Sequence, residues 1–134
     1  MQKTVFTNGC FDLLHVGHIE LLKFCASFGR VVVGINSDAS VKRLKGATRP
    51  IIPQSERFIT LKALRYVDEV IVFEEDTPSR IIDLVKPDMI VKGGDYSVED
   101  VVGYDRAEVK IFPVVPLTST SIIIQRIIHL GRSD

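Results

Sequence analysis

Two histidines, His15 and His18, are the residues whose types and spacing most clearly suggest chemistry. They stand three apart in the segment HVGH, where a helical pattern begins, so both imidazoles project from one side of the first helical turn. Gly17 between them permits close approach of a ligand. The free N–H groups and the positive dipole end of a helix start favour an anion. This pattern predicts a phosphate-binding site.

Two other interpretations of the histidine pair remain open at this point. Zinc is the first, but zinc sites use three or four ligands, and the only other histidine, His129, lies near the C-terminus in the last helical segment. The second is that the imidazoles cap the helix and bond its own backbone. No metal ligands are predicted, and HxGH alone does not decide between capping and phosphate binding.

A cluster of cations follows the second predicted strand. Lys42, Arg43, Lys45 and Arg49 lie within eight residues, in a chain whose 17 basic and 17 acidic residues give a net charge of zero. Such a cluster is either a solvated helix end or a mobile cover for a polyphosphate. Its position beside the expected phosphate site favours the cover, with Lys45 next to a glycine.

Two polar loops later in the chain add further candidates. In VKGGDY, Gly94 lets the backbone approach a ligand and Asp95 can accept hydrogen bonds from hydroxyls or an amine, although a tight turn would use the same residues. TSTS, residues 118–121, precedes the last helical segment. Its hydroxyls can cap that helix or direct its backbone N–H groups toward a phosphate.

Short β-branched segments alternate with longer helical ones, which places these loops in a fold. Strands are expected at Lys3–Thr7, Arg30–Asn36, Glu69–Phe73, Met89–Lys92 and Glu108–Pro113. Helices are expected at Gly17–Phe28, Asp38–Leu44, Gln54–Tyr66, Pro78–Val85 and Ser119–Leu130, with Pro53 in the first turn of the third and Thr77 as the N-cap of the fourth. The prediction is an α/β fold in one domain, residues 1–134: a Rossmann-like, doubly wound, five-stranded parallel sheet with helices on both faces. Ligands of such sheets bind beyond the carboxyl ends of the strands, where the polar loops fall.

Composition and missing motifs exclude several classes of function. A pI of about 6.8 with zero net charge argues against a general nucleic-acid or membrane-surface binder. The apolar runs are far shorter than the roughly 18 residues of a membrane span, and a signal-peptide pattern is missing, so a cytoplasmic protein is expected. Two cysteines make no disulfide framework. The sequence has neither a P-loop nor GxGxxG, and no supported Ser-His-Asp or Cys-His arrangement.

With these motifs in view, the chain resembles the HxGH nucleotidyltransferases of the cytidylyltransferase-like superfamily. TNGCFDLLHVGH resembles the first signature of that superfamily and TSTSII the second. From Val5 to about Ile128 the chain further resembles the D-glycero-β-D-manno-heptose 1-phosphate adenylyltransferases, through NSDASVKRLKG, ERFITLKALRYVDEV and EEDTPSRIIDLVKPDMIVKGGDY. It is similar to their stand-alone form, without a fused sugar kinase.

The resemblance implies a reaction and a set of partners. A phosphate oxygen of a sugar 1-phosphate would attack the α-phosphorus of ATP with Mg²⁺, releasing pyrophosphate and forming ADP-heptose for lipopolysaccharide. The second pKa of a phosphate ester is about 6, so the nucleophile is already ionised and needs no general base. The implied partners are a nucleoside triphosphate, a sugar phosphate and further copies of the chain in a homodimer or larger assembly, with no nucleic acid and no membrane.

The same resemblance implies three groups of site residues. The catalytic residues are His15, His18 and Lys45, which would stabilise the triphosphate and the leaving pyrophosphate. Nucleotide contacts are expected from Thr7, Asn8, Gly9, Cys10, Phe11, Asp12, Gly17, Gly94, Asp95, Ser119, Thr120 and Ser121. Acceptor contacts are expected from Asn36, Asp38, Lys42 and Arg65.

Two departures from the family pattern leave the nucleotide and the acceptor open. The chain is a few residues shorter between Tyr104 and Glu108, and Val115-Pro116-Leu117 replaces the usual Val-Glu-Gly. Val114 stands where glycerol-3-phosphate cytidylyltransferases carry an arginine, which speaks against cytosine, whereas Arg65 in LRYVDEV also occurs in that group. The alternatives are therefore CTP-dependent transfer to glycerol 3-phosphate or a similar polyol phosphate, and a non-catalytic nucleotide-binding module.

Overall fold

The computed structural model describes residues 2–113 and 119–133. The strands are β1 (Thr4–Gly9), β2 (Arg30–Asn36), β3 (Glu69–Phe73), β4 (Met89–Gly93) and β5 (Glu108–Phe112). The helices are α1 (Val16–Ala26), α2 (Asp38–Lys45), α3 (Gln54–Lys62), α4 (Ser79–Val85) and α5 (Thr120–Ser133), with a 3₁₀ turn, η1 (Val98–Asp100), before β5. This alternation confirms the predicted α/β fold.

The five strands form one parallel sheet in the order β3-β2-β1-β4-β5. β1 lies at the centre, where Val5 pairs with Val31 of β2 on one side and Met89 of β4 on the other. The chain adds strands outward from β1 to β3 and then returns to add β4 and β5 on the opposite side. The order of the strands therefore reverses between β1 and β4, and a ligand crevice is expected beyond their carboxyl ends.

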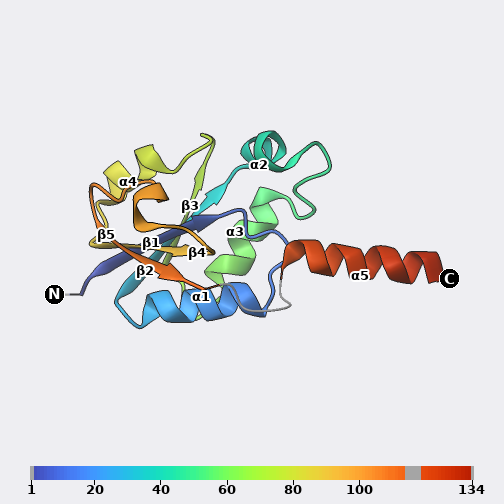
Figure 1. Ribbon diagram of the computed structural model, residues 1–134, viewed down its shortest axis with the longest axis horizontal. Coiled ribbons are helices and arrows are strands. Elements are labelled where there is room, and N and C mark those ends of the chain that lie inside the picture. Colours follow the sequence, from blue (N-terminus) through green and yellow to red (C-terminus); the bar gives the residue numbers. More distant parts are fainter. Residues whose placement is uncertain (1, 114–118, 134) are drawn as a thin grey trace.

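Helices cover both faces of the sheet, as predicted (Figure 1). On one face, Leu22 and Cys25 of α1 and Leu61 of α3 pack against the sheet. On the other face, Ile81 and Ile82 of α4 join Phe6 in a second core cluster. Because both faces are covered, the central strands are nearly continuous apolar runs, and β2 buries every residue after its first.

Several element ends differ from the predicted ones by a few residues. β2 and β3 have the predicted bounds, but α3 ends at Lys62 rather than Tyr66, where Ala63 bonds the carbonyls of both Ile59 and Thr60. Prolines account for three other differences. Pro53 and Pro78 stand just before α3 and α4 instead of inside the first turn, which leaves Thr77 outside the cap, and β5 ends at Phe112 because Pro113 has no N–H to donate.

The last helix, α5, extends away from the sheet (Figure 1). Its apolar residues Ile127, Ile128 and Leu130 are exposed. None of the helices in the two described ranges is long and apolar enough to cross a lipid bilayer.

Candidate active site

The first turn of α1 is built on reciprocal hydrogen bonds between its two histidines. His15 is the N-cap residue, and its Nδ1 accepts a hydrogen bond of 3.1 Å from the backbone N–H of Gly17. Nδ1 of His18 accepts one of 3.2 Å from the backbone N–H of His15. The capping interpretation is thus confirmed. It leaves phosphate binding intact, because a neutral imidazole that accepts at Nδ1 carries its proton on Nε2, where it can be donated to a ligand.

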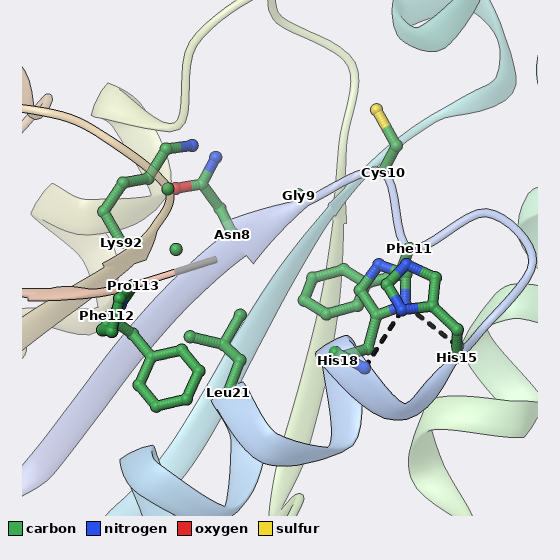
Figure 2. Close-up of a pocket in the computed structure, with 13 residues that line it drawn as sticks. Asn8, Gly9, Cys10, Phe11, His15, His18, Leu21, Lys92, Phe112 and Pro113 are labelled. Carbon is green, nitrogen blue, oxygen red and sulfur yellow. Dashed lines mark hydrogen bonds between the residues drawn. The ribbon is translucent and has the colours of Figure 1, made fainter. Parts of the chain in front are cut away.

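Both imidazoles are neutral near pH 7. Burial lowers the pKa of His18 to about 4, and the neighbouring His15 contributes to the shift. Burial also lowers the pKa of His15. The two rings lie close together, with centroids 3.9 Å apart (Figure 2). The neutral pair can therefore donate from Nε2 to a phosphate, whereas protonation at Nδ1 would break the hydrogen bonds that hold the two rings in place.

Three cavities open around the carboxyl ends of β1 and β4. The α1 cavity, about 240 Å³, lies between α1 and the ends of β4 and β5 and includes both histidines. The α5 cavity, about 700 Å³, lies between α1, the start of α5, and the end of α2 with the loop that follows it, here called the basic loop (residues 46–53). The α4 cavity, about 310 Å³, lies on the opposite face of the sheet, near the loop that precedes α4. Cys10 lines all three cavities, so they meet at the end of β1.

The α1 cavity has a polar end and an apolar end. Figure 2 shows the histidine pair on one side, and the side chains of Leu21 and Phe112 together on the other. Apolar and aromatic walls suit a flat ring system, whereas N–H donors at a helix start suit a phosphate. The cavity therefore has the chemical asymmetry of a nucleotide.

The loop between β1 and α1 is strained and is held by Asp12. Phe11 and Leu13 have φ angles of 51° and 52°, in the left-handed region that costs a non-glycine residue about 1–2 kcal/mol. The carboxylate of Asp12 between them accepts hydrogen bonds of 2.8 and 2.9 Å from the N–H groups of Ile51 and Ile52. Asp12 lines the α5 cavity, and both of its carboxylate oxygens hold the loop; its predicted contact with a nucleotide stays a prediction.

Arg57, which the sequence reasoning missed, ties these loops together. Its side chain is 1% exposed. The guanidinium donates to the carbonyls of Ile52, Cys10 and Asn36 and pairs with Asp38 at 2.9 Å. One buried cation thereby joins the ends of β1 and β2, the start of α2 and the basic loop. Its position on the buried stripe of α3, four residues before the buried Leu61, was the available signal.

Lys92, at the end of β4, was also missed. It lines both the α1 and the α4 cavities, and its Nζ lies 5.4 Å from the centroid of the Tyr96 ring. Burial lowers the pKa of Lys92. Within the described ranges, no carboxylate oxygen lies at ion-pair distance from its Nζ. A charged residue at the end of an otherwise apolar strand, VKGG, was the signal in the sequence.

Most of the predicted site residues converge on the three cavities. The α1 cavity is lined by Asn8, Gly9, Cys10, Phe11, His15, Gly17, His18 and Gly94. The α5 cavity adds Asp12, Lys45, Ser119, Thr120 and Ser121. The α4 cavity adds Asn36. Lys45 lines both the α5 and α4 cavities, as expected of a cation that covers a polyphosphate.

The start of α5 combines capping with a contact to the β1–α1 loop. Ser119 Oγ accepts a hydrogen bond of 3.0 Å from the N–H of Ile122, so its capping role is confirmed. The hydroxyl of Thr120 donates to the carbonyl of Asp12, next to the histidines. Thr118 and the residues at 114–117, where the sequence departs from the family pattern, lie outside the described residues.

Five predicted contacts lie outside the lining of these cavities. Thr7 is fully buried in β1, and its Oγ1 has no hydrogen-bond partner in the described structure. Asp38 is occupied by Arg57 and by the N–H of Gln54. Lys42 and Asp95 are exposed, and Arg65 stacks on Tyr66 just before β3, at the edge of the sheet opposite the site. The structure brings none of these five to the cavities.

The start of α1 lies at the switch point of a parallel sheet, with Lys45 at the end of α2 and Arg49 in the loop after it. This arrangement is typical of a nucleotide-binding α/β domain. The chain belongs to the cytidylyltransferase-like family, whose sequence pattern matches residues 6–126. The predicted membership is confirmed, and with it the nucleotidyltransferase class.

Individual relatives support the assignment to this family. The chain is 54% identical over 127 residues to the bifunctional protein HldE of Nitratiruptor sp., and 52% identical over 134 residues to that of Geobacter metallireducens. The alignments cover 93% and 96% of this chain but only 28% and 27% of those relatives. The chain thus spans little more than a quarter of the curated relatives it matches, and its predicted stand-alone form stays a prediction.

Solved structures show the same architecture. The lipopolysaccharide core biosynthesis protein of Thermoplasma volcanium superposes with a TM-score of 0.71 at 29% identity, over 86% of this chain and 98% of that one. A pantothenate synthetase of Thermus thermophilus superposes with a TM-score of 0.63 at 18% identity, covering 85% of this chain and 56% of that one, and shares the fold alone.

Proposed function

We propose that residues 1–134, as one domain, transfer AMP from ATP to a sugar 1-phosphate, with D-glycero-β-D-manno-heptose 1-phosphate as the acceptor and ADP-heptose as the product. One observation carries this proposal: the neutral histidine pair keeps both Nε2–H donors at the polar end of a cavity whose other end is apolar. The likeness to HldE proteins and to a lipopolysaccharide core biosynthesis protein supports the choice of acceptor.

The reaction is a displacement at the α-phosphorus. A phosphate oxygen of the acceptor forms the new P–O bond, the bond to the β-phosphate breaks, and pyrophosphate leaves with the electron pair. The nucleophile is already ionised near pH 7, since its second pKa is about 6. The protein's task is therefore to orient the two substrates and to stabilise charge on the phosphates.

Different residues around the cavities bind the phosphates and the adenine ring. His15 and His18 donate from Nε2 to the phosphates, and the ammonium group of Lys45 adds positive charge from the end of α2. The adenine ring occupies the apolar end of the α1 cavity, between Leu21 and Phe112. The hydroxyls at the start of α5 bound the space for the leaving pyrophosphate.

Mg²⁺ enters this proposal as part of the substrate. No group of three or more His, Cys, Asp or Glu side chains in the described ranges could hold a metal ion, and both carboxylate oxygens of Asp12 are engaged by backbone N–H groups. Residues 2–113 and 119–133 thus provide no protein cage for the metal. Mg²⁺ is commonly bound through substrate phosphates in nucleotide enzymes, so the substrate we propose is the Mg²⁺ complex of ATP.

Pyrophosphate release tests the proposal on a grid of ATP and CTP against heptose 1-phosphate, other sugar 1-phosphates and glycerol 3-phosphate. We expect turnover with ATP and heptose 1-phosphate. Turnover only with CTP and glycerol 3-phosphate would replace the proposed reaction by cytidylyl transfer. Tight ATP binding without pyrophosphate release from any pair would identify a non-catalytic module.

A substitution at His18 tests the role of the pair. His18→Gln keeps an acceptor for the N–H of His15, since glutamine at this helical position can complete a capping box. We expect turnover to fall by about 10²–10³-fold, as when one preorganised donor is removed, with an unchanged circular dichroism spectrum. His129→Gln, on the exposed part of α5, is the matched control and should retain full turnover. Wild-type turnover in His18→Gln would exclude His18 from the reaction.

A further inference from the structure

The last helix, α5, carries an apolar stripe along one side. Residues three and four apart on a helix share a face, and the stripe consists of Ile123, Ile124, Ile127, Ile128 and Leu130. Ile123 and Ile124 are half-buried, whereas Ile127 and Leu130 are 58% and 64% exposed. The α5 stripe therefore starts at the body of the protein and continues along the projecting part of the helix (Figure 1).

A groove of about 350 Å³ lies where this stripe leaves the body. Ile123 forms one wall, Thr60 of α3 and Ile52 of the basic loop form another, and Leu13 and Leu14 of the β1–α1 loop complete the lining. We call it the α3 groove. Its walls are mainly apolar, so a partner that displaces water from them is favoured. The α5 stripe and the α3 groove are continuous at Ile123.

The helix and the groove carry charges of opposite sign. α5 has Arg126 and Arg132 at the edges of its stripe and contains no acidic residue. Glu56 lines the α3 groove, and its carboxylate has no ion-pair partner among residues 2–113 and 119–133. Arg57, the other charged residue of the lining, is buried and paired with Asp38. The groove therefore presents a negative charge that complements the basic helix.

A single copy of the chain cannot bring these two surfaces together. Leu130 lies seven residues after Ile123, so the straight helix holds it about 10 Å further from the groove. A second copy whose α5 runs antiparallel reverses this order. A two-fold axis near Ile127 places Leu130 of each helix beside Ile123 of the other, and the last turn, with Arg132, then lies beside Glu56 of the other copy.

The area of a stable interface requires the groove as well as the helix. A helix of 14 residues is about 21 Å long and about 10 Å wide, so pairing of two α5 helices alone covers a footprint of roughly 200 Å² per copy. Stable interfaces bury about 800 Å² per partner. The α3 groove and the exposed face of α3 beside it, where Ile59 is 66% exposed, add to this area.

An anionic lipid surface is the other surface that a basic amphipathic helix binds. A lipid surface does not match the groove, however, because it is flat and because Glu56 repels its negative charge. Shape and charge together favour a second copy of the chain.

We propose that α5 is an interface helix: in a symmetric dimer, the α5 stripes of two copies pair antiparallel, and the end of each helix, with Leu130, docks into the α3 groove of the other copy. This interface does not depend on the reaction proposed above. Phe11 and Leu13 of the strained β1–α1 loop line the groove, so each copy supports the loop that precedes the histidine pair of the other.

Sedimentation velocity over a dilution series tests the pairing of the stripes with Ile127→Glu. Ile127 is exposed in one copy and glutamate is a good helix former, so the variant should keep the circular dichroism spectrum of the wild type. We expect the wild type to sediment as a dimer and the dissociation constant of Ile127→Glu to rise at least about 30-fold, as for a residue at the centre of an interface. Gln125→Glu adds the same charge to α5 outside the stripe and should dimerise like the wild type.

Two results would overturn the proposal. One is equal dimerisation of the wild type and Ile127→Glu. The other is a monomeric wild type, and a monomer that floats with phosphatidylglycerol vesicles would assign α5 to a lipid surface instead.

Charge reversal tests the docking of the helix end into the groove. Glu56→Arg should raise the dissociation constant about tenfold, because two exposed charge pairs per dimer become repulsive. Adding Arg132→Glu to this variant should restore the wild-type value. Glu99→Arg, on the exposed turn η1, is the matched control and should leave dimerisation unchanged. Failure of Arg132→Glu to restore association would show that the end of α5 does not reach the groove of the other copy, which would overturn the proposed arrangement.

Discussion

Acidification should lower the free energy of unfolding of this protein, because His18 becomes protonated. Burial lowers the pKa of this imidazole to about 4 in the folded chain, against 6.5 for an unperturbed histidine. Between these values the unfolded chain binds a proton that the folded chain does not, so lowering the pH favours unfolding. Protonation would also convert Nδ1 from an acceptor into a donor and break its bond with the N–H of His15. The stability that His18 contributes is thus complete above about pH 6.5 and declines down to about pH 4.

The size of the effect follows from the two pKa values. At pH 5, about 1.5 units below the unfolded value and about one unit above the folded one, the difference in proton binding lowers the free energy of unfolding by about 2 kcal/mol. This is a large part of the 5–15 kcal/mol that stabilises a typical domain. Other groups titrate over the same pH range, so the contribution of His18 must be isolated with a variant that lacks this imidazole.

His18→Gln isolates it, because glutamine keeps the capping bond and does not titrate. Urea unfolding at pH 7 and pH 5 should show the wild type losing about 2 kcal/mol more than the variant. His15 is present in both proteins, so its own titration largely cancels. Equal losses in the two proteins, within the roughly 10–15% uncertainty of the extrapolation, would refute the assignment of a depressed pKa to His18.

Two further predictions concern the residues that fix the loops of the site. Arg57→Met removes four hydrogen bonds and leaves Asp38 without its buried partner. We expect the free energy of unfolding, measured with urea, to fall by about 3–5 kcal/mol. A decrease below about 1 kcal/mol would show that Arg57 does not hold these loops together. In Asp12→Asn the side chain can accept a hydrogen bond from only one of the two N–H groups, those of Ile51 and Ile52. We expect the free energy of unfolding to fall by about 1–3 kcal/mol and turnover to decrease. Unchanged thermal unfolding would show that the carboxylate does not hold the strained loop.

The fold and the place of the site were predictable because they depend on patterns along the chain. Apolar β-branched runs such as Arg30–Asn36 mark strands that are covered on both faces, and the observed β2 has these bounds. Parallel strands bring their carboxyl ends to one edge, which is why HVGH, the basic loop and TSTS converge. The order of short sequence patterns along the chain was therefore sufficient to predict the fold and the place of the site.

The roles of single polar residues were harder to predict, because their partners lie far away in the sequence. The N–H groups that Asp12 binds are 39 and 40 residues away, and Arg57 bonds a carbonyl 47 residues away. Arg65 shows a different limit. It was selected by family resemblance, yet a residue that ends the return from β2 to β3 must lie at the amino edge of a parallel sheet, away from the site.

The start of α5 is joined to the β1–α1 loop, and the helix projects from that attachment (Figure 1). Thr120 fixes its first turn to the carbonyl of Asp12, beside the histidines, while the rest of the helix extends away from the sheet (Figure 1). Fourteen residues at 1.5 Å each make an arm of about 21 Å. A small rotation at the first turn, which borders the α5 cavity, would therefore displace the C-terminal end of the helix by a larger distance.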